Sequence, residues 1–196
     1  MLIDKFMPLY HFNEVQSIAV RSNSRNNILS AVRDVTPKEI PFLFELFWLR
    51  GLPSFIIQRK RYKYSINRKS PLLEQFLASG FIVLAEEEGR ELVVGGIGQF
   101  WKLWGGSFPI ITNTQEFLSF NCPNYIKVAI NFYLHQDHHD DDYVKVRTET
   151  RFYVPDQTIL KKFSRYWLLV HIFSAFSRRM WLKAIKYRIE NGARTQ

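Results

Sequence analysis

The chain has 196 residues, of which 46% are hydrophobic, so it is long enough for one domain that buries its core without cross-links. Its single cysteine, Cys122, excludes an intramolecular disulfide and a thiolate metal cluster, and favours a reducing, cytoplasmic location. The net charge of +9 favours phosphate-bearing partners, whereas the longest apolar run, 166–176, is far shorter than the roughly 20 residues of a membrane span.

The N-terminal quarter predicts one strand followed by two short helices. The first ten residues lack a long apolar core, so we expect no signal peptide. Residues 12–20 alternate imperfectly and predict a strand, after which Ser22-Asn23-Ser24 offers caps for a helix with apolar positions at 28–32. The run Thr36-Pro37-Lys38-Glu39 is a capping box with proline at the first helical position, and it predicts a second helix over 36–49.

A strongly basic segment follows, and we interpret residues 55–70 as an insertion in a single domain that spans 1–196. Basic loops attract phosphate groups, so this segment is a candidate contact for a polyanion such as an anionic membrane surface. We do not expect nucleic acid to be the partner. The candidate contact residues are Arg59, Lys60, Arg61 and Lys63.

The middle of the chain predicts a short helix and a hairpin. Residues 71–78 are helical in pattern and stop at Gly80. Residues 81–85 and 91–101 predict two strands joined by a turn at 87–90. Glycines at 95, 96 and 98 inside the second strand indicate a bulge, a bend or a close approach. We also expect a short strand over 117–120.

The clearest alternation lies in residues 125–134 and 143–154, which predict a long hairpin with one wet face. The polar loop 135–142 joins the two strands. We expect one face to point toward the last helix: Ile126, Val128, Ile130, Phe132, Val144, Val146, Thr148, Thr150 and Phe152. We expect the other face to be convex, wetter and laced with cross-strand ion pairs: Lys127, Lys145, Arg147, Glu149 and Arg151.

The chain ends in a long predicted helix that opens at Pro155-Asp156, runs to Glu190 and stops at Asn191-Gly192. Small residues interrupt the row of apolar positions along one side of this helix and would leave space between the helix and the sheet. The predicted ligand cavity is bounded by Phe163, Trp167, Val170, Ser174, Ser177, Trp181, Ile130, Val146 and Thr148. The two serine hydroxyls could instead bond to helix carbonyls one turn earlier.

This element order, with its α+β composition, resembles the helix-grip fold of the SRPBCC or START-like superfamily, which includes polyketide cyclases. The resemblance implies a curved antiparallel sheet wrapped around the last helix, with an apolar cavity between them. An uncharacterised bacterial family within that superfamily is similar in four segments: Val35-Thr36-Pro37-Lys38-Glu39-Ile40-Pro41, Pro71-Leu72-Leu73-Glu74, Thr148-Glu149-Thr150-Arg151, and 163–167 followed by Arg178-Arg179.

Other chemistry-bearing groups do not assemble into a recognisable site. The histidines and aspartates of loop 135–142 lack a spacing that would aim them at one metal ion, so we expect a solvated loop, no metal and no cofactor. His171 could serve as a general base if it faced a cavity, but we expect it to be packed or solvent-facing. No set of catalytic residues emerges.

These observations lead to one functional hypothesis and two rivals. We expect a cytoplasmic protein that binds a small hydrophobic or amphipathic ligand between sheet and helix, without demonstrable catalysis. The first rival is a cyclase-like or hydratase-like enzyme of the same superfamily, which a buried ionisable residue beside a cavity would favour. The second is a membrane-surface or protein-interaction module that uses its basic face.

Overall fold

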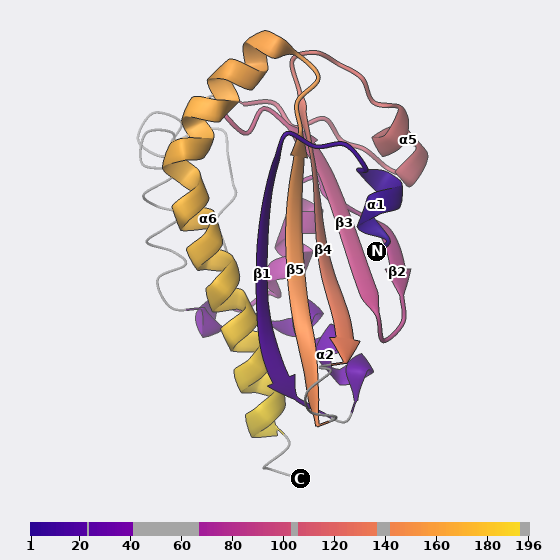
Figure 1. Cartoon of the computed structure of the whole chain (residues 1–196), viewed down its shortest axis with the longest axis vertical. Coiled ribbons are helices and arrows are strands. Elements are labelled where there is room, and N and C mark those ends of the chain that lie inside the picture. The colour runs from indigo at the N-terminus through magenta and orange to yellow at the C-terminus, as the bar shows by residue number, and fades with distance from the viewer. Residues whose placement is uncertain (23, 41–66, 103–105, 137–141, 193–196) are drawn as a thin grey trace.

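The computed structural model describes residues 1–22, 24–40, 67–102, 106–136 and 142–192. They form an α+β fold with a curved, five-stranded antiparallel sheet of order β1-β5-β4-β3-β2 and a long C-terminal helix alongside it (Figure 1). This is the helix-grip arrangement expected from the sequence. The elements are α1 (Ile3–Phe6), β1 (Phe12–Arg21), α2 (Arg25–Asp34), the 3-10 helix η1 (Pro37–Glu39), α4 (Leu72–Ala78), β2 (Ile82–Glu87), β3 (Glu91–Gly98), α5 (Thr114–Ser119), β4 (Ile126–Gln136), β5 (Tyr143–Tyr153) and α6 (Gln157–Gly192).

Local capping signals position several of these elements. The Ser24 side chain accepts a hydrogen bond from the Asn27 amide at the start of α2. Thr36 and Glu39 form the expected capping box at η1. Asp156 Oδ1 accepts a 2.8 Å hydrogen bond from the Ile159 amide and opens α6. With 36 residues, α6 is about 54 Å long.

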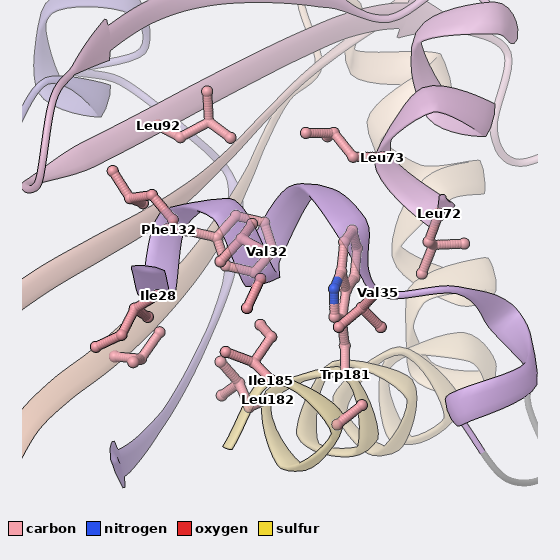
Figure 2. Close-up of a cluster of buried hydrophobic side chains, with 14 of the residues drawn as sticks. Ile28, Val32, Val35, Leu72, Leu73, Leu92, Phe132, Trp181, Leu182 and Ile185 are labelled. Carbon is pink, nitrogen blue, oxygen red and sulfur yellow. The ribbon is translucent and has the colours of Figure 1, made fainter. Parts of the chain in front are cut away.

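The sheet has an inner face, turned toward α6, and an outer face. Most apolar side chains predicted for the inner face pack there with the C-terminal half of α6 and with α2 and α4 (Figure 2): Val128, Ile130, Phe132, Val144 and Val146. Ile126 packs instead with the start of α6. Trp181 rests edge-on against Phe132, with ring centroids 5.0 Å apart. The core residues from helices and sheet point toward one another around Val32, Leu182 and Ile185. The predicted register of the β4–β5 hairpin is therefore confirmed.

The outer face is drier than the sequence predicts. Arg147, Glu149 and Arg151 lie on it, opposite α6, as expected, but Glu149 and Arg151 are buried. The cause is α1, which lies across this face and was not predicted because four residues carry too weak a pattern. The prediction of an exposed, wet face is wrong for these two side chains.

Two further expectations need correction. Residues 114–119 form the helix α5 and not a strand, because the Asn113 side chain accepts a hydrogen bond from the Glu116 amide and caps it. Strand β4 continues to Gln136, so His135 belongs to the sheet and not to the loop. The glycines of β3 permit close approach, as expected: a Cβ on Gly95 would lie 2.6 Å from Leu84 Cδ1.

Several predictions fall outside the described residues. These are residues 41–49 of the predicted second helix, most of the basic insertion at 55–70, and the loop histidines at 138 and 139. The polyanion candidates Arg59, Lys60, Arg61 and Lys63 belong to this group. Their neighbours Arg68 and Lys69 are described and exposed. The described part of the predicted second helix is only η1, which ends at Glu39 with Ile40 in an extended conformation.

Candidate functional site

The inner face of the sheet carries a group of polar side chains beneath the middle of α6. Within β1, Phe12, Glu14 and Ile18 share the inner face because alternate residues of a strand point the same way. Glu14 pairs with Thr150 in the neighbouring strand β5. We call the following set, completed by residues of β5 and α6, the inner polar cluster: Glu14, Thr148, Thr150, Ser174 and Arg178.

Glu14 and Arg178 form the charged centre of this cluster. Arg178 Nε lies 3.9 Å from Glu14 Oε1, which is close enough for ionic attraction and too far for a hydrogen bond. Only 9% of the Glu14 side chain and 12% of the Arg178 side chain are exposed. A buried charge is costly unless it is paired and hydrogen-bonded, so the geometry of this pair is unusual for a purely structural contact.

The polar atoms of the cluster are incompletely satisfied. Arg178 Nη1 donates one long hydrogen bond, 3.5 Å, to Thr148 Oγ1. Among the described residues, no group meets hydrogen-bonding geometry with either Glu14 carboxylate oxygen, with Arg178 Nε or with Thr150 Oγ1. Orphaned buried atoms within one cluster of side chains are a favourable environment for a polar ligand group or a water molecule.

Among the carboxyl groups of the described residues whose pKa is shifted, Glu14 is the one whose pKa is raised. Burial raises the pKa of the Glu14 carboxyl above its ordinary value, and the opposing influences of Arg178, the nearby Ser174 hydroxyl and His171 do not cancel this effect. Burial lowers the pKa of the Arg178 guanidinium, which the charge of Glu14 partly restores. A carboxyl that holds its proton more tightly than usual can donate a hydrogen bond as well as accept one.

Aromatic rings border the cluster on both sides along α6. Toward the start of the helix, Phe163 and Trp167 pack on Phe12 and Phe152, with ring centroids 5.0 to 5.8 Å apart. Toward its end, Trp181 lies one turn beyond Arg178 and packs on the core. The polar cluster is therefore enclosed between two apolar layers, an arrangement that suits a molecule with an apolar body and a polar group.

The structure distributes the predicted cavity residues over these three layers. Phe163 and Trp167 belong to the aromatic layer near the start of α6, and Val170 is half-buried. Ser174 and Thr148 belong to the inner polar cluster. Trp181, Ile130 and Val146 lie together in the main core.

Ser177 differs from the other predicted cavity residues. Its hydroxyl donates a 2.8 Å hydrogen bond to the Phe173 carbonyl, the local alternative considered from the sequence.

Sequence reasoning missed Glu14 and named Arg178 only within one of the segments that carry the family resemblance. A signal was present in both segments. Glu14 lies between the apolar Phe12 and Ile18 on the inner face of β1, and Arg178 lies between Trp167 and Trp181 on the side of α6 that faces the sheet. Opposite charges on two facing apolar surfaces predict a buried pair.

His171 is half-buried, as expected, with Nδ1 placed 2.9 Å from the Trp167 carbonyl oxygen.

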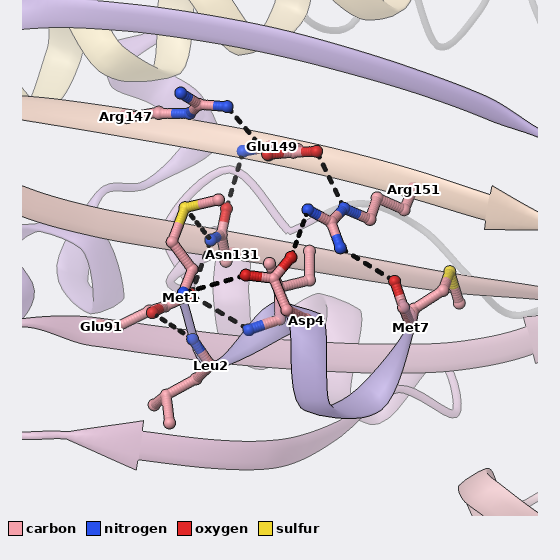
Figure 3. A network of polar contacts seen from close by, with 10 residues as sticks. Met1, Leu2, Asp4, Met7, Glu91, Asn131, Arg147, Glu149 and Arg151 are labelled. Carbon is pink, nitrogen blue, oxygen red and sulfur yellow. Dashed lines mark hydrogen bonds and ion pairs between the residues drawn. The ribbon is translucent and has the colours of Figure 1, made fainter. Parts of the chain in front are cut away.

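A second charged network, on the outer face, has a different character (Figure 3). Arg151 contacts Glu149 at 2.8 Å, Asp4 at 2.8 Å and the Met7 carbonyl at 2.9 Å. Burial raises the pKa of the Glu149 carboxyl, but hydrogen bonds and charge from Arg151 and Arg147 outweigh it and the pKa is lowered. Short, direct bonds of this kind fasten α1 to the sheet, and we assign the network a structural role.

This structural network continues into β3 and β4. Glu91 accepts hydrogen bonds from the Leu2 amide at 2.6 Å and from Asn131 Nδ2 at 2.7 Å. Asn131 Oδ1 in turn accepts a 2.8 Å bond from the Glu149 amide. The N-terminal segment is thus held at several points by the network drawn in Figure 3. The carboxyl groups of this network make direct hydrogen bonds, whereas that of Glu14 makes none with the described residues.

Two kinds of feature are absent from the described residues. Within them, no three His, Cys, Asp or Glu side chains gather as a metal site. None of the described helices combines the length and apolar character needed to cross a bilayer.

Comparisons with known proteins supply no family. No family model matches the chain, and no curated protein is similar to it. Among solved structures, the crystal structure of the hypothetical protein jhp0584 from Helicobacter pylori is similar at a TM-score of 0.43 and 12% sequence identity. The alignment covers 95% of this chain and 93% of that one. A likeness of this degree carries no functional inference.

Proposed function

We propose that the protein binds a small amphipathic molecule between the inner face of the sheet and α6. The observation that carries the proposal is the buried Glu14–Arg178 pair, whose polar atoms remain incompletely hydrogen-bonded between two aromatic layers. In this proposal, the aromatic side chains near the start of α6 contact the apolar body of the ligand. The polar end of the ligand lies at the inner polar cluster.

The chemistry of the pair limits the polar group of the ligand. Arg178 can only donate hydrogen bonds, whereas Glu14 accepts them when ionised and can donate when protonated. A group that both accepts from Arg178 and donates to Glu14 would satisfy both side chains. Hydroxyl, carboxylic acid and primary amide groups have this property, so we propose a ligand that carries one of them. Membership of the SRPBCC superfamily and a cytoplasmic location are parts of the same proposal, supported by the element order and by the single cysteine.

A direct test compares two serines on the same helix. Replacing Ser174 with Leu places bulk beside Glu14, so the variant should bind the fluorescent carboxylic acid 11-(dansylamino)undecanoic acid at least tenfold more weakly than wild type. The matched control is Ser177→Leu, because the Ser177 hydroxyl bonds to its own helix and not to the cluster. Equal probe affinity in wild type and Ser174→Leu, with both proteins folded, would contradict the proposal.

One observation favours a second function, that of an enzyme. Burial raises the pKa of Glu14, and a carboxyl with a raised pKa is suited to general acid or base catalysis near neutral pH. In this second proposal Glu14 exchanges a proton with the bound molecule, and Arg178 stabilises negative charge that develops on it. Glu14→Gln would then retain ligand binding while product formation stops, whereas a binding protein would show no turnover in either form.

A further inference from the structure

The side of α6 that faces away from the sheet carries large apolar side chains. Leu168 and Ile172 are 68% and 64% exposed, and Phe173 and Phe176 are about 40% exposed. Leu168, Ile172 and Phe176 are spaced four residues apart, so they follow one side of the helix. We call these four residues the apolar stripe. The opposite side of the same helix is already occupied by the sheet, so the stripe cannot serve the inner site.

Exposed basic residues flank the apolar stripe at both ends. Lys161, Lys162 and Arg165 precede it, and Arg179 and Lys183 follow it. At about 100° of rotation per residue, the stripe residues other than Phe173 and the flanking cations other than Lys162 lie within one arc of about 80° on the helix surface. Arg165 and Arg179 are each only about 4.5 Å along the axis from the nearer end of the stripe. Apolar and cationic side chains therefore form one continuous surface.

The basic residues of α6 fall into a group that faces the fold and a group that faces outward. Arg178, Lys186 and Arg188 turn toward the fold, where each has a carboxylate within 4.0 Å. The five flanking cations of the stripe have no ion pair with any described residue, and from Gln157 to Ile189 the helix contains no Asp or Glu. The outward surface is consequently positive, and no carboxylate among the described residues compensates its charge.

We propose that this outward surface of α6 docks on an anionic lipid bilayer. The apolar stripe would enter the boundary between headgroups and acyl chains, while the flanking cations contact anionic headgroups. Charge complementarity selects this partner: a second copy of the chain would bring the same positive surface and repel it. The inference is independent of ligand binding on the inner face, and the basic segment 55–70 has no part in it.

The test is sedimentation of the purified protein with vesicles of phosphatidylcholine alone and of phosphatidylcholine with phosphatidylserine. We expect strong binding to the anionic vesicles, weak binding to the neutral ones, and a steep loss between low and high salt. Equal binding to the two vesicle types, or binding to neither at low salt, would overturn the proposal.

Variants locate the contact on α6. Arg165→Gln with Arg179→Gln should weaken binding to anionic vesicles about 25-fold, at about fivefold for each cation. Leu168→Gln with Ile172→Gln should weaken it at least tenfold, and glutamine preserves the helix. The matched controls are Lys5→Gln with Lys145→Gln for charge and Ile110→Gln, at a residue 84% exposed, for apolar surface.

The pattern across these variants decides the proposal, provided that each variant shows the circular dichroism and thermal unfolding of the wild type. Loss in both α6 variants with no change in the controls supports docking through this face. If the Leu168 and Ile172 changes have no effect, attraction is merely electrostatic and the proposed docking is refuted. It is equally refuted if the control variants lose binding to the same extent as the α6 variants.

Discussion

The buried pair of Glu14 and Arg178 leads to a quantitative prediction of the free energy of unfolding. At the observed separation of 3.9 Å and an effective dielectric constant near 20, the attraction between Glu14 and Arg178 is about 4 kcal/mol. Removing both side chains from water opposes this attraction. We therefore expect Glu14→Gln, which leaves Arg178 as an uncompensated buried charge, to lower the free energy of unfolding by about 3 kcal/mol.

Arg178→Met should behave differently, because the remaining carboxyl can take up a proton. Burial already raises the pKa of Glu14, and removing the positive charge raises it further. For a carboxyl whose folded pKa exceeds the unfolded one, stability is complete below the unfolded pKa and falls as pH rises toward the folded pKa. The cost of Arg178→Met should thus be smaller at pH 5 than at pH 8, whereas the cost of Glu14→Gln should depend less on pH.

The stability of the double variant shows whether the Glu14–Arg178 pair itself stabilises the fold. With both charges gone, Glu14→Gln with Arg178→Met should unfold within about 1 kcal/mol of the wild type or be more stable. The assay is urea unfolding followed by tryptophan fluorescence, analysed as a double-mutant cycle. Two single effects that simply add, or a double variant less stable than either single variant, would refute the reasoning.

Two further predictions concern the structural features of the fold. Arg151→Met should lower the free energy of unfolding by about 3 kcal/mol, because the buried Glu149 carboxylate loses its buried partner and keeps only the partly exposed Arg147. The exposed pair of Arg21 with Asp142 predicts less than about 1 kcal/mol for Arg21→Met. Chemical denaturation of both variants tests this difference, and equal effects would contradict it. Gly95→Ala should cost about 1–3 kcal/mol, because its Cβ would lie 2.6 Å from Leu84 Cδ1 and 2.9 Å from Phe117 Cε2. A melting temperature equal to that of the wild type would show that these side chains shift freely.

The elements that could be predicted are those whose pattern extends over many residues. Strands β4 and β5 show their two faces in simple alternation, and α6 shows its caps and its length. The helix α5 was misjudged because the apolar residues at 117, 118 and 120 fit a short strand equally well. Its cap, Asn113 with Glu116, was the available signal.

The candidate site was harder to predict because it depends on which surfaces meet. Glu14 and Arg178 are 164 positions apart in the chain, and each on its own is typical of a solvated residue. Their burial follows from the packing of α6 across β1, which no local pattern specifies. The burial of Glu149 and Arg151 likewise follows from the position of α1. In both cases the charge was visible in the sequence and its environment was not.

The most direct test of the proposed function is native mass spectrometry of the protein as purified from cells, beside the Glu14→Gln/Arg178→Met variant prepared in the same way. We predict that the wild type carries a discrete non-covalent mass excess that disappears on denaturation, and that the variant lacks it. If both proteins have the mass of the bare chain, or if both carry the same excess, the assignment of the inner pair as a ligand anchor is contradicted.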